Sequence, residues 1–155
     1  MDNRKIAGIV EGDSCCIKSE KTEREVIDAK GNYLAPGFID IHTHGGGGSD
    51  FMDNEHSSYE NILKLHMSHV TTALTPTTLA SSHEDLLESV RNYEKFNQVP
   101  KTLGIHLEDP YCSSEQRGAQ EARFLKNPDP KEYLKILEST SCIKRWSVAP
   151  ELNGA

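Results

Sequence analysis

The sequence predicts an α/β fold with a parallel sheet, and two observations support this prediction. From Pro36 onward, short apolar or β-branched runs alternate with helical patterns. Strands that alternate with helices in this way are typical of βα units, whose strands lie parallel. Before Pro36 the sequence holds only short β-like runs and turn signals: Ile6–Val10, Cys15–Lys18, Glu25–Ile27 and the turn Lys30-Gly31-Asn32. We therefore expect a small β segment over residues 1-35 and an α/β domain over residues 36-155.

Four strands are expected after Pro36. They cover Phe38–Ile41, Thr71–Thr75, Thr102–Leu107 and Ile143–Ala149. The first is short and apolar, and the second is rich in β-branched residues, which favour strands.

Three helices are expected between these strands. They cover Asn54–His69, Ser82–Phe96 and Pro130–Glu138. We expect Ser57 or Ser58 to cap the first helix, because serine is a preferred N-cap residue. Ser81 or Ser82 should cap the second helix. The third helix should turn Tyr133, Leu134 and Leu137 inward.

Four strands and three helices amount to half of a closed barrel. A (β/α)₈ barrel typically needs roughly 250 residues, whereas Pro36 to Ala155 supplies 120. We therefore predict a partial (β/α)₈ TIM-type barrel of about four strands, in a fragment of a longer protein. A small complete α/β domain is the alternative. A half barrel has a bare edge strand and should be prone to associate.

Composition limits the classes of partner that we expect for this chain. The formal net charge is −7, which argues against nucleic acid and anionic membranes, because phosphate binding requires surplus lysine and arginine. No apolar run approaches the roughly 18 residues that span a bilayer. The N-terminus leads into no apolar stretch typical of a signal peptide. The four cysteines, at positions 15, 16, 112 and 142, lack zinc-ribbon spacing, so we expect reduced thiols and a cytoplasmic protein.

The residues with the clearest chemical meaning are His42 and His44, at the end of the first predicted strand. Side chains two residues apart on a strand point to the same face, so both imidazoles can bind one metal ion. Asp40 lies on that face one step deeper. The glycines Gly45 to Gly48 follow at once, and glycine lets the backbone approach a ligand or adopt positive φ. The alternative is an unremarkable His-x-His in a surface loop.

Glu108 ends the third predicted strand and shares a face with His106. A carboxylate at a strand end is a candidate ligand for a divalent metal, although a helix cap or a solvated loop acid is the common alternative. His106 lies deeper and is expected to pack or to support a ligand. Thr75-Pro76-Thr77 and Glu151 also fall at strand ends, where turn formation and lining are the expected roles.

Three segments, taken in order, carry a family resemblance. They are Tyr33–Gly45 with Asp50–Asp53, then Thr71–Thr77, then Gly104–Tyr111 with Arg117–Gln120 and Ala149–Glu151. Together they resemble the N-terminal half of N-acetylglucosamine-6-phosphate deacetylase, of the amidohydrolase superfamily. The first segment alone marks the superfamily. The Gly-x-His-Leu-Glu-x-Pro segment, followed by Gly-Ala-Gln, points to the deacetylase.

The resemblance implies a metal-dependent hydrolase that removes the acetyl group from N-acetylglucosamine 6-phosphate, giving glucosamine 6-phosphate and acetate. It implies a partial β-sandwich segment over residues 1-35, a divalent metal (zinc or iron) and a homo-oligomer. Glu108 would be the principal metal ligand, and His42 and His44 would occupy a second metal position. Ala119 and Gln120 would contact the amino-sugar phosphate. The proton-transferring aspartate lies later in family sequences, so no catalytic residue is assigned here.

One departure and two alternatives stay open. The family usually has glycine where this chain has Asp109, which affects the placement of substrate beside Glu108. Dihydroorotase-like enzymes share the His-x-His strand but use a modified lysine as bridging ligand, and no lysine ends a predicted strand here. The alternatives are a catalytically incomplete fragment and an amidohydrolase that acts on a cyclic amide.

Overall fold

A computed structural model of the chain describes residues 6, 8, 9, 11, 27–96, 102–108 and 110–155. The chain forms two compact units, Met1–Ala35 and Pro36–Ala155. In the first unit the predicted turn is present: the Asn32 amide donates to the Ala29 carbonyl at 2.8 Å, with Lys30 and Gly31 at φ 49° and 79°. The β-like runs predicted earlier in this unit fall mostly outside the described residues, and the β-sandwich segment stays a prediction.

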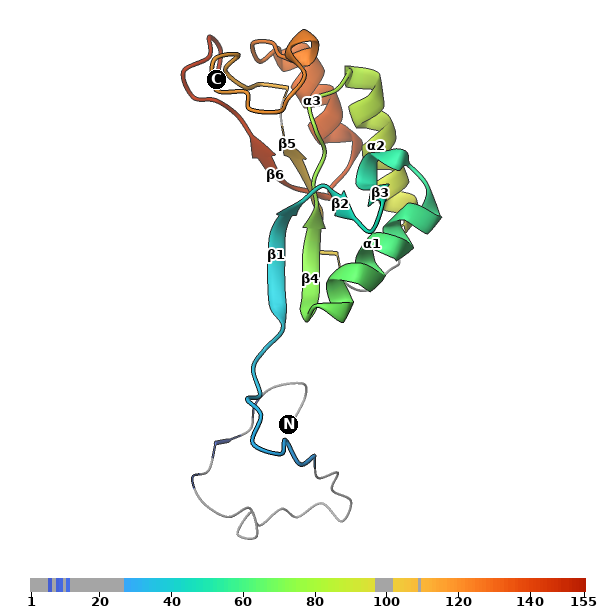
Figure 1. Cartoon of the computed structure of the whole chain (residues 1–155). Coiled ribbons are helices and arrows are strands. Elements are labelled where there is room, and N and C mark those ends of the chain that lie inside the picture. The colour runs from blue at the N-terminus through green and yellow to red at the C-terminus, as the bar shows by residue number, and fades with distance from the viewer. Residues whose placement is uncertain (1–5, 7, 10, 12–26, 97–101, 109) are drawn as a thin grey trace. The chain divides into compact units, whose positions relative to one another are not determined.

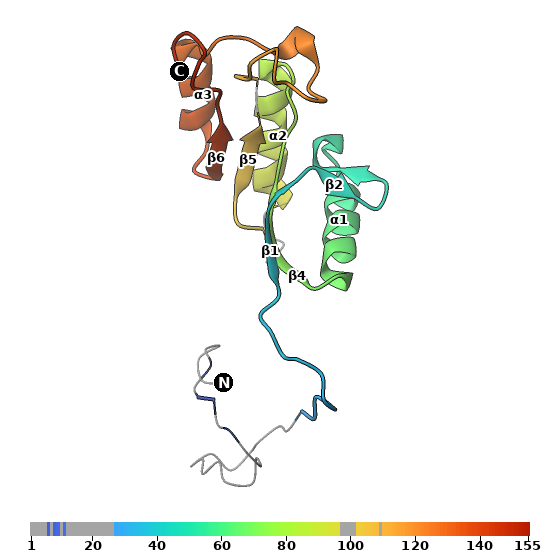
Figure 2. The same ribbon diagram turned by 60° about the vertical axis from the view of Figure 1, so that its left-hand side comes forward.

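The second unit alternates strands and helices (Figures 1 and 2). In chain order these are β1 Phe38–Thr43, β2 Gly45–Gly46, β3 Ser49–Asp50, the 3₁₀ turn Phe51–Asp53, α1 His56–Ser68, β4 Thr71–Pro76, α2 His83–Phe96, β5 Ile105–Glu108, the 3₁₀ turn Ala122–Phe124, α3 Pro130–Ser139 and β6 Ile143–Ser147. All four predicted strands and all three predicted helices are present. None of the described helices has the length and apolarity to cross a bilayer.

The long strands pair in parallel. β1 pairs with β4, and β5 pairs with β6. Two isolated parallel bridges, Leu74 with Thr102 and Thr77 with His106, join β4 to the β5 segment. The strands thus follow one another as β1-β4-β5-β6, and the predicted parallel α/β architecture is confirmed at this level.

The core lies between these strands and the helices. Helix α1 contacts β4, and α2 contacts both β5 and α3. The fully buried apolar side chains come from every layer: Ile62 of α1, Leu74 of β4, Leu86 and Val90 of α2, Ile105 and Leu107 of β5, and Ile136 of α3. Burial of such side chains contributes roughly 1.5–3 kcal/mol each, so this cluster holds the strand ends in place.

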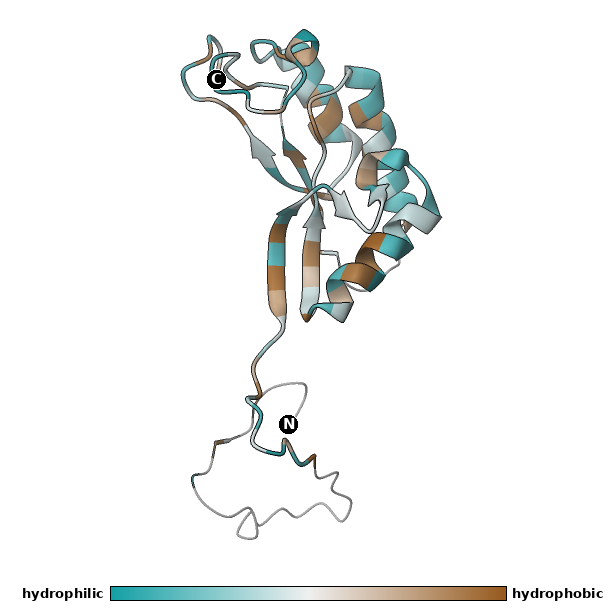
Figure 3. Ribbon diagram, in the orientation of Figure 1, coloured by the Kyte–Doolittle hydropathy of each residue, from teal (hydrophilic) through white to brown (hydrophobic). Residues whose placement is uncertain are grey.

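β1 is the exception, because its apolar side chains are exposed. Phe38, Ile39 and Ile41 are 69, 62 and 59 % exposed. Figure 3 shows brown, hydrophobic bands along β1. In the described residues β1 pairs with β4 alone, so one of its edges is open.

The glycine run after His44 forms a tight hairpin. β2 and β3 pair antiparallel, and the two turn residues, Gly47 and Gly48, have φ of 64° and 81°. Positive φ at both turn positions is the geometry of a two-residue hairpin, which glycine adopts without strain. A Cβ on Gly45 would lie 2.2 Å from the Ser49 carbonyl oxygen. The glycines therefore serve the turn and the close strand approach.

Two helix predictions need correction. Ser57 and Ser58 do not cap α1, whose N-cap is Glu55. The Ser58 hydroxyl instead donates to the Asp53 carboxylate at 2.8 Å, because the preceding 3₁₀ turn brings that acid next to the helix start.

The buried face of α3 also differs from the prediction. Ile136 is 1 % exposed, whereas Leu134 and Leu137 are 45 and 44 % exposed. The helix carries apolar residues on more than one side, and tertiary packing selects the side with Ile136. Helical spacing alone does not determine which stripe is covered.

The neighbouring positions Ile136 and Leu137 give a matched test of this correction. We expect Ile136→Ala to lower the free energy of unfolding by about 2–5 kcal/mol, because it leaves a cavity in the core. Leu137→Ala should cost less than about 1 kcal/mol, because the side chain is already half exposed. Urea denaturation measures both. A larger loss for Leu137→Ala would contradict the packing of α3.

Candidate metal centre

His42 lies in β1 and His44 directly follows that strand, and their side chains are on the same face. The backbone sets this arrangement: the Thr43 carbonyl accepts from the Thr77 amide at 2.9 Å. The Asp40 carboxylate accepts from the His42 amide at 3.0 Å. The two imidazole rings lie edge to face, with centroids 5.0 Å apart. The predicted common face is therefore present.

Glu108, the last residue of β5, meets both histidines. Its Oε2 lies 3.1 Å from Nε2 of His44, and its Oε1 lies 3.6 Å from Nε2 of His42. In the described part of the chain, this trio is the group whose donor atoms converge closely enough to hold one metal ion, all within 4.8 Å of one another. Side-chain exposures of 39, 31 and 24 % for His42, His44 and Glu108 leave the donors open to solvent.

The donor set fits a divalent metal. Two ligand atoms bound to one tetrahedral zinc ion lie about 3.3 Å apart, given bonds of about 2.0–2.1 Å. The two nitrogen-to-oxygen separations of 3.1 and 3.6 Å fall on either side of that value. Imidazole and carboxylate suit zinc, iron and several other divalent ions.

The orientation of His44 strengthens this fit. Its Nδ1 lies 3.2 Å from the Thr77 carbonyl oxygen. A carbonyl only accepts, so Nδ1 carries a proton, and in the neutral ring Nε2 is left with the lone pair that a metal ion requires. Nε2 faces the Glu108 carboxylate oxygen 3.1 Å away, so the two atoms are close enough to bind the same cation.

Thr77 organises the backbone beneath the ligands. It is fully buried. Its hydroxyl donates to the Thr75 carbonyl at 3.1 Å and accepts from the Thr43 amide at 3.2 Å. Its carbonyl holds His44. Thr77, the residue directly after β4, thus fixes both the backbone at Thr43, between the two histidines, and the tautomer of His44.

His106 extends this layer to the other strand pair. Its Nδ1 contacts the Thr77 hydroxyl oxygen at 3.4 Å, and its Nε2 lies 2.8 Å from the Ser147 hydroxyl. Burial, with a smaller contribution from the nearby Arg145, lowers the pKa of His106 to about 4. The ring is therefore neutral near pH 7, donating to Thr77 and accepting from Ser147. It also packs against the His42 ring at 5.1 Å.

An open hollow of about 530 Å³ lies over the metal-site donors. Its lining comprises His42, His44, Leu79, Glu108, Cys112, Gln116, Arg117, Gly118, Ala119, Gln120, Ser147, Val148 and Ala149. Both residues expected to contact substrate, Ala119 and Gln120, are in this lining. Ala119 is exposed, whereas Gln120 is 8 % exposed. Asp109 lies outside the described residues.

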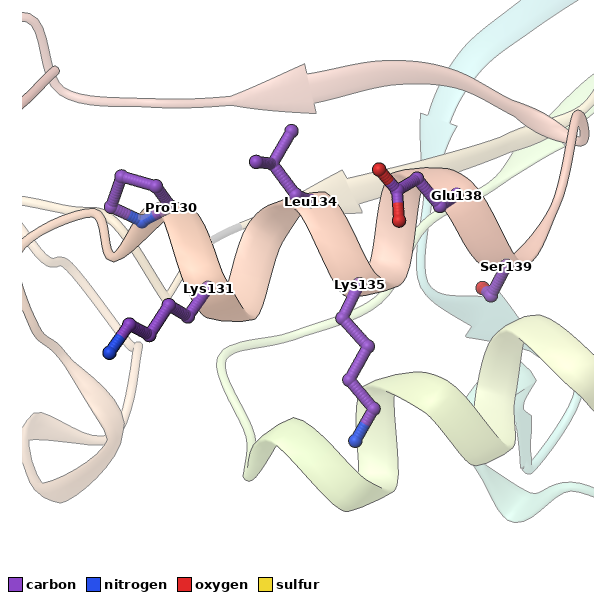
Figure 4. Close-up of a pocket in the computed structure, with 6 residues that line it drawn as sticks. All are labelled: Pro130, Lys131, Leu134, Lys135, Glu138 and Ser139. Carbon is purple, nitrogen blue, oxygen red and sulfur yellow. The ribbon is translucent and has the colours of Figure 1, made fainter.

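A second hollow runs along α3, lined by Pro130, Lys131, Leu134, Lys135, Glu138 and Ser139 (Figure 4). Figure 4 shows Lys135 and Leu134 projecting from opposite sides of the helix. This surface holds one acid and no histidine, so it lacks the convergent donors that distinguish the hollow over Glu108.

Some neighbours of the site were not anticipated from the sequence. The imidazole of His66, on α1, has 19 % side-chain exposure and lies 3.3 Å from the Gly45 carbonyl and 3.4 Å from the Thr43 hydroxyl. Thr77 was expected only to form a turn or to line the barrel. Each owes its role to contacts 20 or more residues away along the chain, which local spacing does not reveal.

Comparison with known proteins identifies the family. A family model described as the amidohydrolase family matches residues 25–109. The chain belongs to this family. The amidohydrolase match includes β1, β4 and β5, and hence all three converging donors.

Two curated relatives of this amidohydrolase chain share a name. The chain is 33 % identical over 150 residues to N-acetylglucosamine-6-phosphate deacetylase of Caenorhabditis elegans, and the match covers 88 % of this chain and 36 % of the relative. The Bacillus subtilis protein of the same name is 29 % identical, and the match covers 93 % of this chain and 39 % of that relative. The chain thus spans a little over a third of the length of these curated relatives.

Solved structures of proteins with this name are also similar to the chain. The deacetylase of Mycobacterium smegmatis, a D267A mutant in complex with N-acetyl-D-glucosamine-6-phosphate, gives a TM-score of 0.74 at 33 % identity, over 77 % of this chain and 32 % of that one. The Pasteurella multocida enzyme gives 0.76 at 26 %, over 81 and 34 %. The resemblance drawn from the sequence is confirmed.

The hydroxyl of Thr77 provides a test of the layer beneath the ligands. Thr77→Val keeps the side-chain shape but leaves the Thr43 amide without its buried acceptor. We expect a loss of about 1–3 kcal/mol in the free energy of unfolding. Thr72→Val, at an exposed position of β4, should lower the free energy of unfolding by less than about 0.5 kcal/mol. Equal effects of the two changes in urea denaturation would contradict the role given to Thr77.

Proposed function

We propose that this chain carries the metal-binding N-terminal part of an N-acetylglucosamine-6-phosphate deacetylase. The observation that carries the proposal is the convergence of His42, His44 and Glu108 from two strands, in a chain whose relatives have that name. The whole protein would release acetate from N-acetylglucosamine 6-phosphate and leave glucosamine 6-phosphate.

The fold proposed for this part is the first half of a (β/α)₈ barrel. The order β1-β4-β5-β6 supports it, since consecutive strands of such a barrel are neighbours. The open edge and exposed apolar side chains of β1 also support it, because a closed barrel would cover them. Residues 1-35 would contribute to a β-sandwich.

The proposed metal ligands are Glu108, His42 and His44, and the proposed ion is zinc or iron. A bound divalent ion would supply Lewis-acid polarisation of the acetamide carbonyl and would acidify a water molecule. The chain's own residues orient the donors for this purpose. Thr77 sets the His44 tautomer, and Asp40 fixes the backbone at His42.

The proposed substrate contacts are Ala119 and Gln120, in the loop that lines the hollow. The Arg117 guanidinium donates to the Gln120 carbonyl at 2.5 Å, and the Gln120 amide donates to the Arg117 carbonyl at 3.0 Å. These bonds close a turn that presents Ala119 to the hollow. Of the charged side chains in the described lining, Arg117 is the cation, which suits a phosphorylated sugar.

A second function, metal binding without turnover, has one observation in its favour. Among the described residues that line the hollow, Glu108 is the only acid. As a metal ligand it is not free to carry the proton to the leaving amine. Action on a cyclic amide by the lysine-dependent route is less well supported, because the same described lining contains no lysine.

We also propose a reducing, cytoplasmic setting and a homo-oligomeric whole protein. The four cysteines lack zinc-ribbon spacing, and Cys15 and Cys16 are adjacent in sequence, which is awkward for a disulfide framework. This pattern suits a reducing compartment. The homo-oligomer is proposed from the family resemblance.

The proposal is tested by metal analysis together with an acetate-release assay on the 155-residue chain. We expect about one divalent ion per chain, and at least about tenfold weaker binding in Glu108→Gln, which loses a charged ligand. His56→Gln is the matched control, because His56 is an exposed histidine on α1 that does not line the hollow. It should leave the metal content unchanged.

The assay then separates the two functions. Acetate release that Glu108→Gln abolishes supports the deacetylase activity in this chain. Stoichiometric metal without acetate release supports the metal-binding part alone. The absence of both would contradict the proposed site.

A further inference from the structure

The side chain of Gln120 is buried in a loop that is otherwise open. It is 8 % exposed, while its neighbours Arg117, Gly118 and Ala119 are exposed. A buried amide requires hydrogen-bond partners at both ends. Those partners show what the side chain does.

The two ends of the amide join the loop after β4 to the metal-site acid. Oε1 of Gln120 accepts from the Ala80 amide at 2.8 Å. Because a backbone amide only donates, this bond fixes which end of the side chain is oxygen. Nε2 therefore faces Glu108 and donates to its Oε2 at 2.9 Å.

This bond acts on the oxygen that also faces His44. Oε2 of Glu108 lies 3.1 Å from Nε2 of His44. A hydrogen bond from Gln120 to Oε2 restricts rotation of the carboxylate, and it leaves Oε1, 3.6 Å from Nε2 of His42, without a bond from Gln120. A hydrogen-bond donor behind a ligating carboxylate orients that carboxylate toward the metal ion.

We propose that Gln120 is a positioning residue: its side chain orients the Glu108 carboxylate toward the histidines, and the Ala119-Gln120 backbone is left to meet the substrate. This deepens the proposed function and rests on it, since it requires that Glu108 bind a metal ion. The amide oxygen is committed to Ala80 and one amide proton to Glu108, so the side chain is primarily part of the metal centre.

The test is a double-mutant cycle on the 155-residue chain, with cobalt(II) as the probe and its dissociation constant measured by competition with a chelator. We expect Gln120→Met to weaken binding about 10- to 100-fold, as loss of a ligand's hydrogen-bond partner does. In the Glu108→Ala background, the same change should have little further effect, because the oxygen that accepts from Gln120 is gone. Ser114→Met, at an exposed polar residue of the same loop that does not line the hollow, should leave the wild-type constant unchanged.

The remaining outcomes each have a defined meaning. A loss of equal size in both backgrounds would mean that Gln120 only supports the loop, and no loss in the wild-type background would mean that it does not act on Glu108. Either result overturns this inference while the metal site stands. A wild-type chain that binds no cobalt overturns the proposed function and this inference together.

Circular dichroism checks that each variant is folded. If Gln120→Met does not fold, Gln120→Asn replaces it. The shorter amide cannot reach Ala80 and Glu108 at once, and it should weaken cobalt binding in the same direction.

Discussion

The geometry of the metal centre depends on Thr77, which is buried where β4 ends. Its hydroxyl accepts from the amide of Thr43, between the two histidines, and its carbonyl fixes the tautomer of His44. Its hydroxyl oxygen also meets His106, two residues before Glu108. A single residue therefore relates the strand that carries the histidines to the strand that carries the acid. Together with the backbone bond from the Thr78 amide to the His106 carbonyl at 3.0 Å, this link holds the donors of the two strand pairs at a fixed separation.

Burial and exposure are divided accordingly. In the polar layer of Thr77, His106 and Ser147, the first two are fully buried and Ser147 is half-buried, and the hydrogen bonds among them are made within the protein. Such a layer is costly if any member loses its partner, which makes it rigid. The donors above it are partly exposed and can reach an ion. Rigid support beneath accessible ligands is the arrangement that metal sites require.

Much of this arrangement could be predicted from the sequence. The His-x-His pattern determines a common face because strand geometry has a period of two, and Glu108 at a strand end follows from the same rule. Strand and helix positions were also accessible, since each has a local pattern. The buried side of α3 and the cap of α1 were not, because Ile136 and Glu55 are chosen by neighbours in space. The links through Gln120 and His66 were not accessible for the same reason: each joins atoms distant in sequence, and no local spacing encodes them.

The central claim is that His42, His44 and Glu108 bind one ion together, and X-ray absorption at the zinc edge of the zinc-loaded chain tests it most directly. The account predicts a first shell of nitrogen and oxygen at about 2.0–2.1 Å, with outer-shell scattering from two imidazoles. His42→Ala and His44→Ala should each remove one imidazole from that pattern, whereas His56→Gln should not. A shell that contains sulfur, or a spectrum that these two changes leave unaltered, would contradict the claim.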